Sequence, residues 1–301
     1  MAERAIDIDN NGVRLSGTLT LPDSPPPRCP AVLLVQGSGP TDRDGNQPPH
    51  GITNLLSGIA GALAGAGIAS LRYDKRGQYR SAPAPSGFEA VKVFARFENY
   101  VNDARAAFTT LTRQPDIAPT RCGVLGHSEG GLIALHMTMP PVACVMLAAT
   151  AARRVDLLLA AQIDALARRQ GATEAQRAQI AAELRSIFDE IRRTETTPTT
   201  ISPGLRAFFP PYLAGFQHQI ADIDPLSLAA RAAVPMAIIQ GGADAQVSPT
   251  DDAEPLRRAL PKAEFTLVDG LDHNLNPVGA KEPGASPAAL QAIARWFAAH
   301  L

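Results

Sequence analysis

Short uninterrupted runs of apolar residues recur along the chain, separated by stretches in which apolar positions repeat every three or four residues. The uninterrupted runs predict buried parallel strands, because a strand covered on both faces has no polar side, and the other stretches predict amphipathic helices. The predicted strands of this kind are 31–35, 122–125, 142–147 and 236–240, and 68–72 and 264–268, which contain polar residues, are predicted as further strands of the series. The predicted helices are 52–66, 97–113, 155–169, 174–193, 250–260 and 286–300. This alternation predicts an α/β fold with a mostly parallel central sheet and helices on both faces.

The amino-terminal segment follows a different pattern, in which β-rich runs over 4–9 and 13–21 flank Asn10-Asn11-Gly12. Asn-Gly between two such runs favours a tight hairpin turn, because both residues tolerate a positive φ. The segment therefore predicts an antiparallel hairpin that precedes the parallel strands.

The alternation stops between 150 and 230, where no run has the pattern of a strand. Two helices are predicted there, and the second begins with Thr173 and Gln176 at the spacing of a capping box. Its apolar stripe consists of Ile180, Leu184, Ile187, Phe188 and Ile191. We therefore expect an α/β core formed by 1–149 and 231–301, and a helical insertion at 150–230 that packs on the sheet.

Length and charge narrow the classes of protein to consider. The 301 residues, 45% of them apolar, are enough for one large α/β domain with an insertion. Lys and Arg number 28 against 29 Asp and Glu, without a long basic or acidic run, so we expect no nucleic-acid partner and no attachment to an anionic membrane surface. The lack of a signal-peptide pattern predicts a cytoplasmic protein, and three cysteines fit a reducing compartment.

The stretch Gly126–Gly131, Gly-His-Ser-Glu-Gly-Gly, lies between the predicted strand 122–125 and an apolar run typical of a helix. A serine on such a turn, with glycine two residues before and after it, is the sequence pattern of a nucleophile elbow. We expect Ser128 at positive φ, and Gly126 and Gly130 at points where a Cβ atom would collide with crossing backbones. An ordinary glycine-rich turn is the alternative, so the pattern needs partners elsewhere in the chain.

Candidate partners of Ser128 follow later strands, since the site of an open α/β sheet is formed by loops at the carboxyl ends of its strands. Asp244 follows the strand 236–240 and His273 follows the strand 264–268, so a serine, an acid and a histidine occur in that order. We expect Ser128 to be the nucleophile, His273 the general base, and Asp244 the residue that orients the histidine.

Other acids compete for the role of Asp244. Asp269 and Asp272 are rivals, although Asp272 adjoins the histidine in sequence, where neighbouring side chains diverge. Asp251 and Asp252 are expected to be acids in the first turn of a helix. None of the other histidines is expected to act as the base: His50, His127, His136, His218 and His300.

Three segments carry a resemblance to a known superfamily: 37–46, 71–77 and 126–131. Through them the chain resembles the α/β-hydrolase superfamily over nearly all of its length, and more narrowly the bacterial esterases of the dienelactone-hydrolase-like and prolyl-oligopeptidase-like branch. The resemblance implies carboxylester hydrolysis and a helical cap between the sixth and seventh core strands, where 150–230 lies. Two positions depart from the pattern: Gln36, where many relatives have histidine, and 78–80, where a small residue is common.

The oxyanion formed during acyl transfer needs two hydrogen-bond donors. The expected donors are the backbone N–H of Glu129, which follows the nucleophile, and that of Ser38 in the turn that begins at Gln36. A plain turn is the alternative for Gly37–Gly39. The role of the Glu129 side chain is not predicted.

No cofactor and no metal are expected. Asp42–Asn46 resembles a calcium loop superficially, but Thr53 stands where a bidentate glutamate is needed, so its charges are expected to bind within the loop or to 74–76. No Gly-Lys-Ser/Thr follows the glycines at 37 and 39, so this segment is not expected to be a phosphate-binding P-loop. Aromatic residues of the insertion either line an acyl pocket or pack the cap: Phe208, Phe209, Tyr212 and Phe216.

The expected activity is therefore hydrolysis of small or medium carboxylic esters through an acyl-enzyme, with a small-molecule ester as the partner. A thioesterase, a peptidase or an acyltransferase would use the same three residues, so these activities remain alternatives. A non-catalytic binding protein on the same scaffold is a more distant alternative, because the serine, the acid and the histidine are all present. No oligomeric state is predicted.

Overall fold

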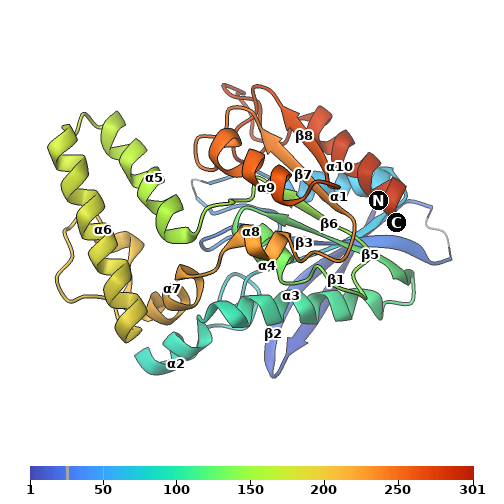
Figure 1. The fold of residues 1–301 in the computed structure, drawn as a ribbon. Coiled ribbons are helices and arrows are strands. Elements are labelled where there is room, and N and C mark those ends of the chain that lie inside the picture. The colour runs from blue at the N-terminus through green and yellow to red at the C-terminus, as the bar shows by residue number, and fades with distance from the viewer. Residues whose placement is uncertain (25–26, 50) are drawn as a thin grey trace. The chain divides into compact units, whose positions relative to one another are not determined.

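The computed structural model describes residues 1–24, 27–49 and 51–301, so His50 lies outside the described residues. Eight strands form one sheet in the order β1-β2-β4-β3-β5-β6-β7-β8 (Figure 1). The strands are β1 (Ala2–Asn10), β2 (Val13–Leu21), β3 (Cys29–Val35), β4 (Ala69–Tyr73), β5 (Ile117–His127), β6 (Val145–Ala148), β7 (Met236–Gly241) and β8 (Glu264–Val268). Every predicted strand is present, with ends that differ by a few residues.

The sheet is mostly parallel, as expected. β1 and β2 form the predicted antiparallel hairpin, and its turn residues Asn11 and Gly12 have φ of 52° and 85°. β2 pairs antiparallel with β4, and all pairs from β4 to β8 are parallel. The carboxyl ends of the parallel strands therefore lie along one edge, where the loops that carry candidate chemistry emerge.

The chain divides into two compact units. The first unit consists of Met1–Pro83, Val101–Ala152 and Pro225–Leu301, and the second of Ala84–Tyr100 and Arg153–Asp224. The first unit contains the whole sheet, so it is the α/β core. The second unit is described separately below.

Helices cover both faces of the sheet in the first unit. On one face, α1 (Leu55–Gly65) and α10 (Pro287–His300) share a buried core with alternate strand residues such as Leu34, Leu125 and Ile239. The opposite face carries the first-unit part of α3 (Phe97–Thr112), together with α4 (Glu129–Leu135) and α8 (Pro225–Ala229), as Figure 1 shows. The predicted helix at 250–260 is a π-helical turn, η3 (Pro249–Ala253), that continues into α9 (Glu254–Ala259).

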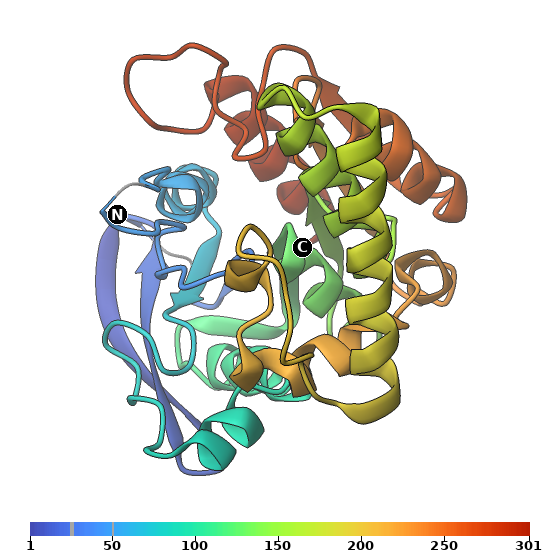
Figure 2. The same cartoon turned by 90° about the vertical axis from the view of Figure 1, so that its left-hand side faces the viewer.

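The second unit is helical and has its own apolar core. It contains α2 (Phe88–Phe94), α5 (Val155–Arg169), α6 (Glu174–Thr194), η1 (Arg206–Phe208), η2 (Pro211–Leu213) and α7 (Ala214–Ala221). α5 and α6 lie side by side (Figure 2). The capping box of Thr173 and Gln176 is formed, and the predicted stripe is confirmed because Leu184, Ile187 and Ile191 are buried in this core.

The second unit differs in its ends from the predicted insertion at 150–230. It includes 84–100, because the rings of Phe97 and Tyr100 pack edge-on against Phe216 at centroid distances of 5.7 and 5.6 Å. Conversely, α8 belongs to the first unit. Contacts between residues far apart in sequence decide these boundaries, and no local pattern shows them.

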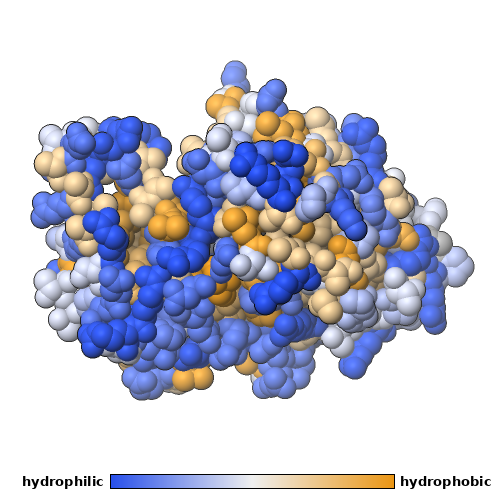
Figure 3. Space-filling view, in the orientation of Figure 1, coloured by the Kyte–Doolittle hydropathy of each residue, from blue (hydrophilic) through white to orange (hydrophobic). Residues whose placement is uncertain are grey.

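The surface agrees with the balanced composition. Figure 3 shows that the visible face is mainly hydrophilic, with apolar side chains in small separate patches. Among the helices described, none is long and apolar enough to cross a membrane.

Candidate active site

Ser128 lies at the turn between β5 and α4, with φ of 56° and ψ of −119°. The predicted positive φ is therefore confirmed, and few L residues adopt this conformation without strain. The Ser128 N–H donates to Ala148 O at 2.9 Å and its carbonyl accepts from Gly131 N at 2.9 Å, so the backbone of the turn is held on both sides. The strained conformation is maintained by the elements around it.

The glycines of the turn are required by close contacts between backbones. A Cβ atom on Gly126 would lie 2.2 Å from the Gly130 carbonyl oxygen, and one on Gly130 would lie 2.3 Å from that of Val35. Both predicted collisions are thus confirmed. Gly131 has the same requirement, which the sequence did not reveal, because a Cβ there would lie 1.9 Å from the Thr150 hydroxyl oxygen.

Replacing Gly126 by alanine is expected to destabilise the fold by at least about 3 kcal/mol, because backbone atoms must move to admit the methyl group. Gly65, the last residue of α1, is a matched control, since a Cβ atom there would have no neighbour within 4 Å. Gly65→Ala should leave the free energy of unfolding unchanged or raise it by up to about 1 kcal/mol. Denaturant titration of both variants measures the difference, and equal stabilities would show that the close packing at Gly126 is not rigid.

His273 and Asp244 are brought together as the sequence predicted. The His273 Nδ1–H donates to Asp244 Oδ2 at 2.8 Å, and both residues are buried. This bond leaves Nε2 as the ring nitrogen without a proton in the neutral histidine. Ser128 and His273 both line one cavity of about 220 Å³ in the first unit.

The Asp244 carboxylate is held by several donors. Its Oδ1 accepts from the backbone N–H groups of Gln246 and Val247 at 2.8 and 2.9 Å, and the Gln240 side chain donates to Oδ2 at 2.9 Å. Burial opposes ionisation, but the hydrogen bond and charge of His273 and these N–H groups outweigh it, so the pKa of Asp244 lies below its usual value. Gln240 was not anticipated, although a polar side chain at the end of a buried strand is the signal that could have found it.

Asp272, one of the two rival acids, has other partners. Asp272 Oδ1 accepts from the backbone N–H groups of Asn274 and Asn276, which ties it into its own loop. Asp252 is in the first turn at 249–253, as expected, but it is buried and accepts from Ala152 N. Among the described residues, Asp244 is the one acid with a hydrogen bond to the His273 ring.

His127 has a position that the sequence did not suggest. Its buried side chain donates from Nε2 to the main-chain oxygen of His273 at 2.9 Å, and the two rings are 4.9 Å apart. A Cβ atom on Gly37 would lie 3.2 Å from His127 Nδ1. Burial, together with the charge of His273, lowers the pKa of His127 to about 3, so the ring is neutral. It therefore joins three segments of the site without adding a charge.

Replacing His127 by glutamine is expected to make stability less dependent on pH. The unfolded chain binds a proton at His127 below about pH 6.5, whereas the folded protein does so only near its pKa of about 3. The wild type therefore loses stability as pH falls through this window, by roughly 2–3 kcal/mol between pH 6.5 and 4.5. Denaturant titrations from pH 7 to 4.5 give the free energy of unfolding of the wild type and of His127→Gln at each pH. The difference between the two proteins should shrink by this amount as the pH falls. A difference that stays constant with pH would contradict a neutral buried His127.

The turn after β3 approaches Ser128. A Cβ atom on Gly37 would lie 3.2 Å from Ser128 Cβ, so the backbone passes directly beside the elbow. Ser38 also lines the cavity. Glu129 is the first residue of α4, where backbone N–H groups have no partner within the helix. The two residues expected to supply oxyanion donors thus follow Gly37 and Ser128, whose backbones approach each other at the elbow.

Ion pairs explain the charged loops around the site. The Glu129 side chain, whose role was not predicted, accepts from Lys75 Nζ at 2.9 Å. Arg43 binds Asp74 through its backbone N–H and guanidinium, with Nη2 2.6 Å from Oδ2. Asp42 Oδ1 accepts hydrogen bonds from the backbone N–H groups of Asp44 and Asn46 in its own loop. The expectation that these charges bind within the loop or to 74–76 is therefore confirmed for Asp42 and Arg43, whereas Asp44 accepts a hydrogen bond from Arg72 Nε at 2.7 Å.

The four aromatic residues of the predicted insertion divide into two kinds. Phe209 is 1% exposed, and its ring packs edge-on against Phe188 at 5.5 Å, while Phe216 packs against the rings at the start of α3. Phe208 and Tyr212 keep 38% and 43% of their surface exposed. Packing within the second unit thus accounts for two of the four rings.

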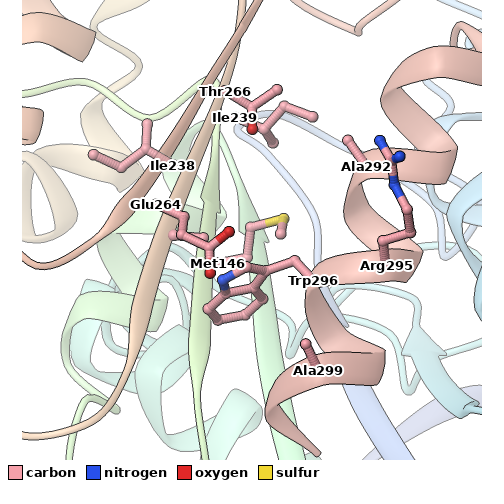
Figure 4. A pocket seen from close by; sticks show the side chains of 10 residues that line it. Met146, Ile238, Ile239, Glu264, Thr266, Ala292, Arg295, Trp296 and Ala299 are labelled. Carbon is pink, nitrogen blue, oxygen red and sulfur yellow. The ribbon is translucent and has the colours of Figure 1, made fainter.

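A second cavity, of about 240 Å³, lies in the first unit between α10 and β6–β8 (Figure 4). Its walls are mostly apolar, with Glu264 and Arg295 among them, and the indole of Trp296 projects into it from α10. The described residues that line it include no serine, cysteine or histidine. Cys29, Cys122 and Cys144 are all buried, and burial raises the pKa of Cys122 and Cys144 to about 12, which disfavours a reactive thiolate.

Curated proteins of similar sequence include an esterase. Esterase EstD of Thermotoga maritima is 29% identical over 302 residues, which cover 97% of this chain and 66% of that protein. The uncharacterized protein Rv2307c of Mycobacterium tuberculosis is 29% identical over 138 residues, which cover 45% of this chain and 41% of that protein. The chain thus spans less than two thirds of the length of these relatives.

Solved structures share the fold. Est1E from Butyrivibrio proteoclasticus, with ferulic acid bound, superposes with a TM-score of 0.63 at 15% identity, covering 98% of this chain and 99% of that one. The α/β hydrolase GrgF from Penicillium superposes with a TM-score of 0.64 at 18% identity, covering 100% and 99% of the two chains. The family model Hydrolase_4, described as serine aminopeptidase, S33, matches residues 51–276. The chain therefore belongs to the Hydrolase_4 (S33) family and has the α/β-hydrolase fold.

Proposed function

We propose that the protein is a serine hydrolase that cleaves carboxylic esters of small or medium size through a covalent acyl-enzyme. The observation that carries this proposal is one cavity lined by Ser128 on a strained elbow and by His273 bonded to a buried carboxylate. The similarity to a curated esterase along nearly the whole chain supports an ester as the substrate. Because this chain matches 66% of the length of that esterase, esterase activity is assigned to it only as part of this proposal.

The roles of the three residues follow from their protonation states. His273 Nδ1 donates to Asp244, so Nε2 accepts the proton of the Ser128 hydroxyl as its oxygen attacks the ester carbonyl. Asp244 remains ionised, because its pKa is below the usual value, and stabilises the imidazolium that forms. The C–O bond then breaks, Nε2 returns the proton to the alcohol, and water repeats the sequence on the acyl-enzyme to release the acid.

The oxyanion of each tetrahedral intermediate would be bound by the backbone N–H groups of Ser38 and Glu129. The close approach of Gly37 to Ser128 and the place of Glu129 at the start of α4 support this assignment. The ion pair of Glu129 with Lys75 ties the second donor to the loop after β4. A preorganised donor of this kind contributes about 10²–10³ in kcat.

A fluorophosphonate probe tests the proposal, because it phosphonylates serines that a neighbouring base activates. The wild type should be labelled at Ser128, as read by peptide mass spectrometry. Ser38, which lines the same cavity, is an internal control and should stay unlabelled. A folded wild type without label at Ser128 would favour a binding protein on the hydrolase scaffold.

The family description makes peptide hydrolysis the second candidate. An aminopeptidase must recognise a terminal ammonium group, for which a carboxylate is the usual partner. The described residues that line the cavity in the first unit include no Asp or Glu, which favours neutral esters. Rates with p-nitrophenyl esters, an amino-acid p-nitroanilide and an acyl-CoA would separate esterase, peptidase and thioesterase activity. Faster cleavage of the anilide than of the esters would make peptidase the first candidate and esterase the second.

We also propose that the second unit is the cap and selects the substrate, with the exposed rings of Phe208 and Tyr212 in contact with acyl chains. Each additional buried CH₂ contributes about 0.8 kcal/mol, or roughly fourfold in affinity. The double variant Phe208→Ala/Tyr212→Ala should therefore lower the preference for octanoate over acetate esters by at least about fourfold. Leu157→Ala, at an exposed leucine of α5, is the control, and an unchanged preference in the double variant would oppose the assignment.

A further inference from the structure

One buried amide contacts the loop of the orienting acid at three points. Gln240 is the fifth of the six residues of β7, and its side chain has no exposed surface. Its Nε2 donates to Asp244 Oδ2 at 2.9 Å, and to the carbonyl oxygens of Val247 and Gly241 at 3.2 and 3.3 Å. Since only the nitrogen of an amide can donate, these acceptors fix its orientation. The amide therefore joins both ends of the loop 241–247 to the carboxylate between them.

The Asp244 carboxylate has a donor for each of its acceptor positions. Oδ1 accepts from the backbone N–H groups of residues 246 and 247, and Oδ2 accepts from His273 Nδ1 and Gln240 Nε2. An ionised carboxylate has about four such positions, so these four donors saturate it. Gln240 supplies the fourth bond, and it does so on the same oxygen that bonds the histidine.

Glutamine is a costly residue at this position of the strand. The four preceding residues of β7 are apolar, and the whole strand is buried. Gln240 Oε1 has no hydrogen-bond partner among the described residues, which costs free energy that an apolar side chain would avoid. Gln240 is also not one of the residues that line the cavity beside Ser128. The amide is therefore placed to act on Asp244 and not on a substrate.

We propose that Gln240 is a positioning residue for the reaction, whose amide holds the Asp244 carboxylate in the orientation in which Oδ2 faces His273 Nδ1. The inference rests on the proposed ester hydrolysis and adds a residue that touches neither the substrate nor the reacting atoms. Without this donor, Oδ2 keeps an unpaired acceptor position in a buried site, and the two ends of the loop 241–247 are no longer joined. The base is then held less firmly beside Ser128, which slows the chemical step.

Gln240→Met tests the proposal, because methionine has a similar volume and no donor. We expect kcat for an ester to fall by about tenfold, the effect of one hydrogen bond to a charged group, with KM within about twofold of the wild type. Gln240→Asn is a second variant, whose amide is one methylene too short for Oδ2, so the same loss is expected. Thr138→Val is the control, since it removes a buried hydroxyl bonded to Leu135 O outside the cavity lining, and it should retain kcat within about twofold.

A double-mutant cycle separates positioning through Asp244 from a general loss of stability. If Gln240 acts through the carboxylate, its removal has no further effect once the carboxylate is gone. Asp244→Ala/Gln240→Met should therefore have the kcat of Asp244→Ala within about twofold, although Gln240→Met alone loses about tenfold. An equal loss in both backgrounds would overturn the proposal, because Gln240 would then act independently of Asp244. A folded Gln240→Met or Gln240→Asn with the kcat of the wild type would also overturn it.

A spectroscopic measurement separates this inference from the proposed function. The proton between His273 Nδ1 and Asp244 Oδ2 should give a low-field ¹H NMR signal, which is identified by its loss in His273→Gln. The signal should shift in Gln240→Met, because Oδ2 loses its second donor, and stay unchanged in Thr138→Val. An unchanged signal in Gln240→Met would overturn the inference and leave the hydrolase intact if Ser128 is labelled by a fluorophosphonate. A shifted signal without labelling or ester hydrolysis would remove the proposed function, and the positioning role with it.

Discussion

Replacing Ser128 by alanine is expected to lower kcat for ester hydrolysis by about 10⁶-fold, because no acyl-enzyme can then form. The remaining rate should come from water bound in the same cavity and from the oxyanion donors, whose backbone N–H groups the substitution leaves in place. The measurement is kcat on an ester that the wild type cleaves, with the fluorophosphonate label as a second readout. A loss smaller than about tenfold would show that another residue is the nucleophile.

The same position also allows the backbone strain to be measured. Ser128 has φ of 56°, and alanine at this position keeps the steric conflict of its Cβ atom, whereas glycine relieves it. Ser128→Gly should therefore be inactive but more stable than Ser128→Ala by about 1 kcal/mol. Equal stabilities would show that the elbow stores no strain.

Replacing Asp244 by asparagine is expected to lower kcat by about 10⁴-fold with little change in KM. The asparagine amide would donate to His273 where the carboxylate accepts, which favours the tautomer whose Nε2 carries a proton and cannot receive one from Ser128. The imidazolium would also lose its counter-charge, which is buried and bonded to Gln240 and two backbone N–H groups. Steady-state kinetics on one ester, with denaturant titration to confirm folding, measures both effects.

Asp269→Asn is the matched control, since Asp269 is the other acid that ends a strand near His273 in sequence. It should retain kcat within about threefold, because surface or loop substitutions without a bond to the reacting groups have small effects. If Asp269→Asn, and not Asp244→Asn, removes activity, the assignment of the orienting acid is wrong.

Local rules were enough to predict a large part of this molecule. Buried parallel strands favour uninterrupted apolar runs, so β3, β5, β6 and β7 could be located from the pattern of apolar residues alone. Asn-Gly between two β-rich runs favours a hairpin, and a serine between glycines on a strand-to-helix turn favours positive φ and close backbones. These features depend on neighbours in sequence, which is why Ser128, Gly126 and Gly130 have the predicted conformation and contacts. The order of serine, acid and histidine along the chain is likewise a property of the sequence.

Contacts between distant segments decided the rest. Several acids follow strands in sequence, and it is the packing of the loops after β7 and β8 that leaves Asp244 bonded to His273 while Asp272 binds its own loop. His127 was set aside as a base, yet its ring lies between the elbow and the histidine loop, because β5 delivers it to the interior beside His273 O. No periodicity encodes such a contact.

The same division applies to the substrate side of the site. The sequence indicates a serine nucleophile by itself, since the strain and the glycines are local requirements. It does not indicate which side chains line the cavity beside Ser128, or that 84–100 joins the second unit. Burial and hydrogen bonding are set by whatever the folded chain brings nearby, so they are properties of the tertiary structure. The reaction class can therefore be predicted from neighbouring residues, whereas the surroundings that select a substrate exist only once the segments have packed.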